Sequence, residues 1–203
     1  MPIILATVAA YLLGSVSFAI LVSRLMRLPD PRSYGSKNPG ATNVLRTGKK
    51  VAAVLTLAGD ALKGFVAVIL ALIYLPESAP YAGVAAFLGH VFPVFHRFQG
   101  GKGVATAAGV LFGFSAWLGA GAIATFAIIV AFFRYVSLAS MIAATFAIFF
   151  SWFIGLDHVT TGAIAVMAAL LIWRHKDNVK RLIAGTESKL GQKKATPPDP
   201  NAA

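Results

Sequence analysis

The chain has 203 residues, of which 58% are hydrophobic and only 12% are charged, and its mean hydropathy is +0.76. This composition excludes an ordinary soluble domain and is typical of an integral membrane protein. Cysteine is absent, which excludes disulfides and thiolate chemistry. A net charge of +11 can indicate a nucleic-acid partner. Here the basic residues instead follow the pattern of cytoplasmic loops, so we expect a phospholipid bilayer and no nucleic acid as the partner.

The apolar residues occur in long blocks that predict membrane-spanning helices. The first block, residues 3–23, is uncharged and has no basic residue before it. We therefore interpret it as a retained span rather than as a cleaved signal peptide. A polar and strongly basic segment occupies residues 24–50. The later apolar blocks are residues 51–75, 81–95, 104–133, 137–155 and 159–173.

The charges between the blocks predict how the chain crosses the membrane. If residues 104–133 form a hairpin of two short spans that turns near residues 116–119, nearly every Lys and Arg falls on one side. Lys63 then lies inside a span, and the other side carries only Glu77 and Asp157 as charged groups. A single tilted helix over the same block would move the basic C-terminal segment to the wrong side.

These blocks predict an all-α integral membrane protein with seven transmembrane helices, with the N-terminus periplasmic and the C-terminus cytoplasmic. Some of the helices are short for a bilayer core of about 30 Å. Residues 1–187 are expected to form one polytopic membrane domain, and residues 188–203 a disordered polar tail.

Three polar clusters share the predicted cytoplasmic face, and the second of them, FQGGKGVAT, has the features of a phosphate site. Glycines expose backbone N–H groups, Gly103 opens a helix whose N-terminus favours an anion, and Lys102 adds a positive charge. The alternative is a flexible loop with one topology lysine. A nucleotide P-loop is excluded, because that pattern needs a glycine in place of His96 and a Ser or Thr in place of Gly103.

Purely structural or topological roles are an alternative for the residues of the other two clusters. Ser36, Thr42 and Asn43 could be turn and helix-cap residues around an Asn-Pro-Gly sequence. Arg46 and Arg181 could be topology charges and nothing else.

Polar residues inside the predicted spans also need an explanation. Asp60 and Lys63 are three residues apart and share one helix face, so pairing inside the bundle is the economical interpretation. His90 also lies within a predicted span, where a polar side chain usually pairs with a group on a neighbouring helix or has a function. No set of residues has metal-ligand spacing, and no Ser-His-Asp arrangement is recognisable.

The ordered segments SKNPGATNVLR, GHVFPVFHRFQGGKGVAT and HKDNVKRLIAGTE resemble those of the bacterial acyl-phosphate-dependent glycerol-3-phosphate acyltransferases, the PlsY family. The resemblance runs from about residue 11 to about residue 187, and the sequence DALKG at residues 60–64 also fits it. It implies transfer of a fatty acyl group from acyl phosphate to the 1-hydroxyl of glycerol 3-phosphate. The products would be lysophosphatidic acid and inorganic phosphate, in the first acylation of phospholipid synthesis.

The resemblance further implies a site that faces the cytoplasm from the bacterial inner membrane, with no cofactor and no metal. An upstream enzyme that forms acyl phosphate is a candidate partner. The residues expected to bind acyl phosphate are Ser36, Gly40, Thr42, Asn43, Gly100, Gly101 and Gly103. Those expected to bind glycerol 3-phosphate are Arg46, Lys102, Ser140, His175 and Asn178. Those expected to be catalytic are Lys102, Ser36, His175 and Asn178, and those expected to support the site are His90, Arg181 and Glu187.

Two mechanisms and two other function classes stay open. Direct attack of the glycerol hydroxyl on the acyl carbonyl would send its proton to a substrate phosphate or to His175, whereas a covalent route would pass through an acyl-Ser36. The sequence offers no His-x-x-x-x-Asp pair of the kind that acyl-thioester-dependent acyltransferases use. The other classes are a small transporter or channel for an anion, and a membrane anchor or assembly protein that uses its basic face on anionic lipid.

Overall fold

The computed structural model describes residues 1–192, and these residues form helices and loops without a β-strand. The α-helices are α1 (Pro2–Gly14), α2 (Phe18–Leu25), α3 (Ala41–Val44), α4 (Lys50–Tyr74), α5 (Ala79–Val91), α6 (Val104–Phe114), α7 (Ala116–Phe133), α8 (Val136–Phe153), α9 (His158–Arg174) and α10 (Lys176–Ile183). Short 3₁₀ turns connect them, namely η1 (Leu45–Thr47), η2 (Pro76–Ser78) and η3 (Val94–His96).

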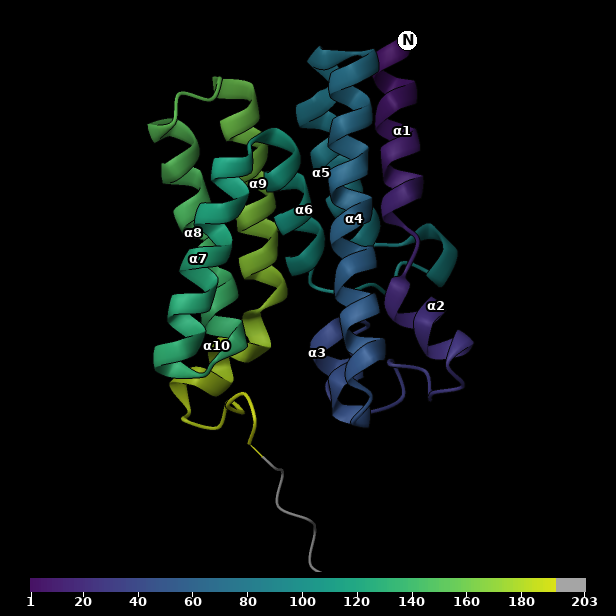
Figure 1. The fold of residues 1–203 in the computed structure, drawn as a ribbon, viewed down its shortest axis with the longest axis vertical. Coiled ribbons are helices and arrows are strands. Elements are labelled where there is room, and N and C mark those ends of the chain that lie inside the picture. Colours follow the sequence, from purple (N-terminus) through teal and green to yellow (C-terminus); the bar gives the residue numbers. More distant parts are fainter. Residues whose placement is uncertain (193–203) are drawn as a thin grey trace, which may run out of the picture.

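The long helices form two groups that meet at α4 and α6 (Figure 1). Helices α1, α4 and α5 make one group, and α7, α8 and α9 make the other. Glycines allow the close approach of α4 and α6: a Cβ at Gly109 would lie 1.9 Å from the Ala61 carbonyl oxygen, and one at Gly64 would lie 2.3 Å from the Thr106 carbonyl oxygen. Such small-residue contacts are a common way to pack helices inside a membrane.

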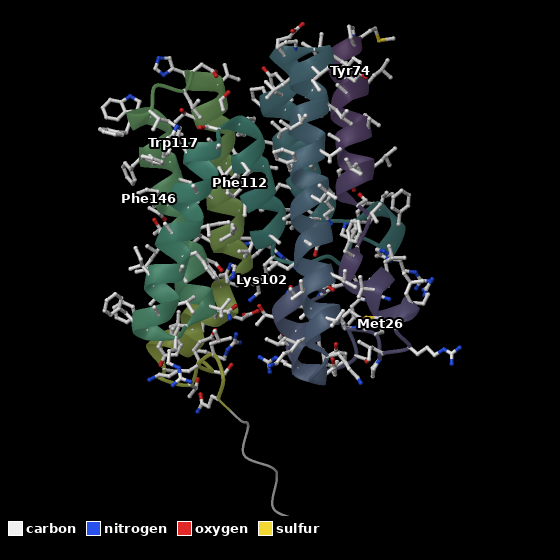
Figure 2. The ribbon with its side chains drawn as sticks, viewed as in Figure 1. Met26, Tyr74, Lys102, Phe112, Trp117 and Phe146 are labelled. Carbon is white, nitrogen blue, oxygen red and sulfur yellow. The ribbon has the colours of Figure 1, made fainter. Side chains whose placement is uncertain are left out.

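Five helical stretches are long and apolar enough to cross a bilayer, namely Pro2–Leu25, Lys50–Tyr74, Pro76–His96, Ala116–Phe133 and Val136–Phe153. Helices α6 and α9 are apolar but shorter. Large side chains such as Trp117 and Tyr74 are 78% and 79% exposed, and Figure 2 shows the outer surface of the helices covered with such groups. An apolar outer surface of this kind is suited to lipid.

The structure divides residues 104–133 into two helices, as the charge pattern predicts. The break lies at Ser115, whose backbone is extended, one residue before the predicted turn. Helices α6 and α7 then pack against each other.

The first apolar block is long enough to cross the bilayer but is not one continuous helix. Helix α1 ends at Gly14 and α2 begins at Phe18. A Cβ at Gly14 would lie 2.1 Å from the Ala86 carbonyl oxygen, so α1 presses closely on α5 here. The Val16 carbonyl, left free by the break, accepts a hydrogen bond from Lys63 Nζ at 2.7 Å. A polar partner inside the bundle therefore stabilises the interruption.

The predicted polar tail begins in an ordered contact. Leu190 donates its N–H to the Arg134 carbonyl at 2.7 Å, and the Arg134 guanidinium donates to the Leu190 carbonyl at 2.7 Å. Residues 193–203 of that tail lie outside the described residues.

The three polar clusters lie at the same end of the molecule. Helices α2, α3 and α10 are found at the end opposite the N-terminus (Figure 1). The turn between α8 and α9 lies at the other end, where Asp157 caps α9 by accepting hydrogen bonds from the N–H groups of Val159 and Thr160. The fold therefore brings together sequence segments that are more than a hundred residues apart.

Candidate functional site

The first cluster is a loop held in shape by the buried side chain of Asn43. Its Oδ1 accepts the Ser36 N–H at 3.0 Å, and its Nδ2 donates to the carbonyls of Pro31 and Tyr34 at 2.7 and 3.2 Å. Gly35 has a φ of +59°, and a Cβ there would lie 2.3 Å from Asn43 Oδ1. These contacts fix the backbone around Ser36 at the edge of the site.

The second cluster, residues 100–103, is a glycine loop packed tightly against the end of α5. A Cβ at Gly100 would lie 2.1 Å from the His90 carbonyl oxygen, and one at Gly101 would lie 2.2 Å from His90 Nε2. Gly103 has a φ of +81°, and a Cβ there would lie 2.2 Å from the Phe87 ring. Gly101 also donates its N–H to the His90 carbonyl at 3.1 Å. Three glycines are therefore required by the close packing and by the backbone conformation.

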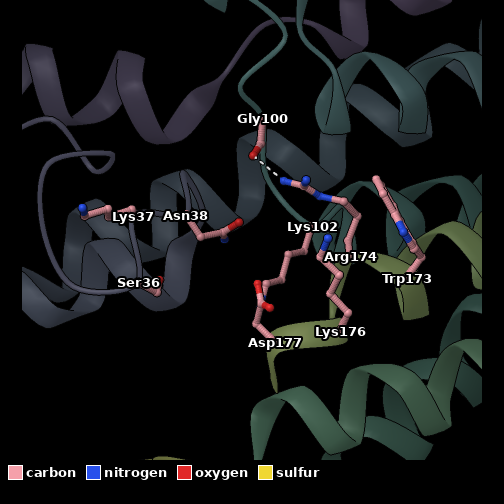
Figure 3. A pocket seen from close by; sticks show the side chains of 9 residues that line it. All are labelled: Ser36, Lys37, Asn38, Gly100, Lys102, Trp173, Arg174, Lys176 and Asp177. Carbon is pink, nitrogen blue, oxygen red and sulfur yellow. Dashed lines mark hydrogen bonds between the residues drawn. The ribbon is translucent and has the colours of Figure 1, made fainter. Parts of the chain in front are cut away.

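The third cluster, residues 175–187, is joined to the glycine loop through Arg174, the last residue of α9, which directly precedes the cluster. Its Nη2 donates to the Gly100 carbonyl at 3.1 Å and its Nε to the Gly101 carbonyl at 3.3 Å. Figure 3 shows Arg174 reaching across to Gly100, with Trp173 beside it. The guanidinium lies 5.9 Å from the centre of the Trp173 ring. Helix α9 and the glycine loop are thus joined into one wall.

A cavity of about 180 Å³ lies between this wall and the first loop. In Figure 3, Asn38 points toward the Gly100 and Arg174 side, whereas Lys37 points away. The cavity is lined by Ser36, Lys37, Asn38, Gly100, Lys102, Trp173, Arg174, Lys176 and Asp177. Four cations and one carboxylate give this lining a net positive charge, which favours an anionic ligand.

Lys102 is held by a polar network that crosses four segments of the chain. Lys102 Nζ donates to Asn178 Oδ1, and Asn178 Nδ2 donates to Glu187 Oε1 at 2.6 Å. Glu187 also accepts from Ser137 Oγ at 2.6 Å and from Arg181 Nε at 2.7 Å. Figure 2 places Lys102 between the two helix groups, toward the end opposite the N-terminus. The amide of Asn178 orients the ammonium group without neutralising its charge.

The pKa shifts show that the positive charge of Lys102 is partly desolvated and only partly compensated by nearby carboxylates. Burial lowers the pKa of Lys102 from 10.5 to about 8, although the Glu187 carboxylate opposes the shift. Burial, followed by the nearby Lys102 cation, lowers the pKa of His175 from 6.5 to about 4. Burial alone would raise the pKa of Glu187, but its hydrogen bonds with Ser137, Asn178 and Arg181 lower it. An anionic ligand would offset the cost of partly burying this ammonium group.

His175 is neutral at pH 7 and has a defined tautomer. Its Nδ1 lies 2.8 Å from the Leu171 carbonyl oxygen, which can only accept, so Nδ1 carries the proton. Nε2 is then an acceptor that can bind a hydroxyl. The ring is 3% exposed, so it is held firmly between α9 and α10.

The structure brings some of the expected site residues together and leaves others apart. Ser36, Gly100 and Lys102 line one cavity, and Asn178, Arg181 and Glu187 belong to the network behind Lys102. The other expected residues do not line that cavity in the described part of the chain, namely Gly40, Thr42, Asn43, Arg46, Gly101, Gly103, His90, Ser140 and His175.

Three of those residues have surroundings that bear on their expected roles. Thr42 and Arg46 are exposed on α3 and η1, so their polar groups are free to reach a ligand outside this cavity. Ser140 is buried and donates to the Val136 carbonyl of its own helix at 2.8 Å. Their expected roles in substrate binding stay predictions.

Sequence reasoning missed several residues of the site. Arg174 precedes His175 at the end of an apolar block and was indistinguishable from a topology charge. The sequence places Ser137 on the same membrane face as the polar clusters, at the start of α8, but assigns it no role, and only its contact with Glu187 shows that it belongs to the network. Neither residue carries a local signal, because each partner is distant in sequence.

Fold and site together define a helical membrane protein with a cationic cavity at one end of its bundle. Residues 4–185 match the family model described as glycerol-3-phosphate acyltransferase. A protein of Cupriavidus necator named glycerol-3-phosphate acyltransferase is 57% identical over 197 residues, which cover 94% of this chain and 98% of that protein. A Burkholderia pseudomallei protein of the same name is 57% identical over 201 residues, covering 97% and 99%.

A solved structure supports the same relationship. The crystal structure of PlsY, described as an integral membrane glycerol 3-phosphate acyltransferase in its glycerol 3-phosphate form, superposes with a TM-score of 0.90. It is 38% identical and covers 94% of this chain and 96% of that one. Its lysophosphatidic acid form gives a TM-score of 0.89 at 36% identity. The chain belongs to the glycerol-3-phosphate acyltransferase family of the PlsY type.

Proposed function

We propose that the protein transfers a fatty acyl group from acyl phosphate to the 1-hydroxyl of glycerol 3-phosphate, producing lysophosphatidic acid and inorganic phosphate. The observation that carries this proposal is Lys102, a partly buried ammonium with a neutral partner, in a cationic cavity beside the first loop. Two phosphate-bearing substrates need such a surplus of positive charge. Solved relatives described as glycerol 3-phosphate and lysophosphatidic acid forms support the acceptor and the product.

The choice of donor follows from the weak bases of the site. His175 has a pKa of about 4, and Glu187 already accepts three hydrogen bonds with a lowered pKa, so neither group is a strong proton acceptor at pH 7. Acyl phosphate is a mixed anhydride with a good leaving group and makes little demand on a base. A thioester donor would need a more strongly activated hydroxyl.

The proposed reaction is a direct attack. The 1-hydroxyl oxygen of glycerol 3-phosphate bonds to the acyl carbon, and the bond from that carbon to the phosphate oxygen breaks. Lys102 stabilises the departing phosphate, and His175 Nε2 accepts a hydrogen bond from the hydroxyl and orients it. The hydroxyl proton passes to the departing phosphate, because that group is more basic than His175 with its pKa of about 4.

A covalent route through Ser36 is the less favoured mechanism. The Ser36 N–H is bound by Asn43, and among the described residues no base accepts a hydrogen bond from Ser36 Oγ. A serine nucleophile needs such a base to activate it. Trapping of an acyl-Ser36 in a quenched reaction would favour the covalent route.

We further propose seven crossings, in which α1 with α2 forms the first and α4 to α9 form the rest. The N-terminus then faces the periplasm, and the site faces the cytoplasm from the inner membrane. A multi-pass membrane structure supports this arrangement, as does the position of the polar clusters at the end opposite the N-terminus. The acyl chain would enter from the lipid, and an upstream enzyme would supply acyl phosphate.

The proposed topology can be tested by labelling. Since the chain lacks cysteine, Lys37→Cys and Glu77→Cys variants can be labelled with an impermeant maleimide in spheroplasts. Only the Glu77→Cys variant should react.

The decisive experiment supplies the purified protein with glycerol 3-phosphate and three acyl donors in turn. The donors are palmitoyl phosphate, palmitoyl-CoA and palmitoyl-acyl carrier protein, and the products measured are inorganic phosphate and lysophosphatidic acid. We expect both products in equal amounts with palmitoyl phosphate only. Activity with a thioester would contradict the proposed donor. Absence of product with every donor, from folded protein that moves phosphate into liposomes, would instead favour an anion transporter.

A further inference from the structure

The bundle contains a buried charged cluster that the proposed chemistry does not use. Asp60 and Lys63 on α4 and His90 on α5 are 2%, 3% and 7% exposed. Lys63 Nζ lies 2.8 Å from Asp60 Oδ1, which confirms the pairing expected from their spacing. His90 Nδ1 lies 3.5 Å from the same oxygen. Ionisable groups among apolar helices are costly to bury, so their presence calls for a role.

One side of this cluster contacts the segment that leads to the first loop. Lys63 Nζ donates to the Val16 carbonyl, the group left free by the break between α1 and α2. Helix α2 follows directly and continues into the loop that contains Ser36. Lys63 therefore fixes the point from which this part of the chain leaves the bundle.

The opposite side of the cluster contacts the glycine loop. The His90 carbonyl accepts the Gly101 N–H at 3.1 Å, and the imidazole lies against the same residue, where a Cβ would be 2.2 Å from Nε2. The Pro39 carbonyl of the first loop lies 3.0 Å from that Cβ position. Gly101 is thus enclosed between the His90 ring and the first loop. A shift of the ring would change the distance between the two walls of the cavity.

We propose that Asp60, Lys63 and His90 act together as positioning residues that set the spacing between the first loop and the glycine loop. This inference rests on the proposed function, because the two loops are the walls expected to bind the substrate phosphates. Asp60 joins Lys63 to His90, and the ion pair keeps both partners in place. Reaction rates depend steeply on such spacing, because displacement of a binding group by about 1 Å can cost about a hundredfold in rate.

The variant that tests the proposal is the double replacement Asp60→Asn with Lys63→Met. Removal of a single partner would leave an unpaired charge in the bundle and could prevent folding. The double replacement removes one negative and one positive charge together and keeps side chains of similar volume, but it loses the contact of Lys63 with the Val16 carbonyl. Ser151→Ala is the matched control. Ser151 is also buried and polar, but it lies near the C-terminus of α8, away from the two loops. We expect kcat/KM with palmitoyl phosphate to fall at least tenfold in the double variant and to stay at the wild-type value in the control.

A distance measurement tests the positioning without relying on activity. Spin labels on Lys37→Cys and Gln99→Cys, introduced into the cysteine-free chain, report the separation of the two loops by electron paramagnetic resonance. We expect the distance distribution to shift or broaden in the double variant and to remain unchanged in the control. This result does not depend on catalysis, so it stays informative even if the unmodified protein transfers no acyl group and the proposed function fails.

An unchanged distance distribution in the double variant would overturn the proposal, as would a wild-type kcat/KM. If the double variant does not fold, His90→Gln and His90→Leu replace it. A Gln side chain carries an N–H donor that can face Asp60, which lies 3.5 Å from His90 Nδ1 in the wild type, whereas Leu carries none. The Gln variant should therefore retain at least several-fold more of the wild-type kcat/KM. Equal kinetics in these two variants would also contradict a positioning role.

Discussion

Replacement of Lys102 by Met should abolish most activity without weakening the fold. The substitution keeps an unbranched side chain of similar length and removes the ammonium group. Loss of one preorganised donor to a developing negative charge typically costs about 3–4 kcal/mol, or about 10² to 10³ in rate. We therefore expect kcat/KM with palmitoyl phosphate to fall by about two to three orders of magnitude.

The same substitution should stabilise the protein at neutral pH. The decrease in the pKa of Lys102 from 10.5 to about 8 corresponds to at most about 3 kcal/mol of cost for burying the charged form. The lost hydrogen bond to Asn178 offsets about 1 kcal/mol of that gain. Because the folded-state pKa lies below the unfolded one, the wild-type penalty is complete below pH 8. It decreases as the pH rises toward 10.5 and is absent above that value.

Thermal denaturation in detergent, followed by tryptophan fluorescence, measures this difference at pH 7 and at pH 10. We expect Lys102→Met to denature at a higher temperature than the wild type at pH 7, and the difference to shrink at pH 10. Lys49→Met is the matched control, because Lys49 is an exposed cation that does not line the cavity. Near-normal kcat/KM from folded Lys102→Met protein, or a large loss of stability at pH 7, would refute this account of Lys102.

Three further expectations follow from the same geometry. The kcat/KM of the wild type should fall as the pH rises through about 8, because Lys102 loses the proton that phosphate binding requires, and Lys102→Arg should move this decline to higher pH. Asn178→Asp should raise the KM for glycerol 3-phosphate at least tenfold, since the new carboxylate would pair with Lys102 and compete with the substrate phosphate. Gly101→Ala should lower kcat/KM at least tenfold, because its Cβ would lie 2.2 Å from His90 Nε2, whereas Gly162→Ala, with open space around it, should leave kinetics unchanged.

The helical architecture could be predicted because it depends on local signals. Apolar blocks and the positions of Lys and Arg reflect the transfer of each segment into lipid, which is a property of the segment itself. The division of residues 104–133 into α6 and α7 followed from charge alone. The break between Gly14 and Phe18 was not predicted, since it depends on the carbonyl of Ala86 and on the ammonium group of Lys63, both distant in sequence.

The candidate site was only partly predictable for the same physical reason. Lys102 and the glycines were recognisable because their chemistry is local. The glycines were expected to expose backbone N–H groups to a phosphate. In the structure the carbonyls of Gly100 and Gly101 accept hydrogen bonds from Arg174, and the Gly101 N–H donates to the His90 carbonyl. These contacts hold the loop in place, and no pattern in residues 98–106 reveals the partners.

The site keeps its structural contacts and its reactive groups separate. The first loop is held by the Asn43 amide, and the glycine loop by Arg174 and by the His90 carbonyl. Lys102, in contrast, contacts a neutral amide, and the nearest carboxylate of the network lies beyond Asn178, where it is already bonded to three donors. The positive charge is thereby oriented without a directly bonded carboxylate, and its partial burial lowers the pKa of Lys102. We expect a substrate phosphate to supply an anion beside Lys102, so that the free energy lost in partly burying this cation would be recovered on binding.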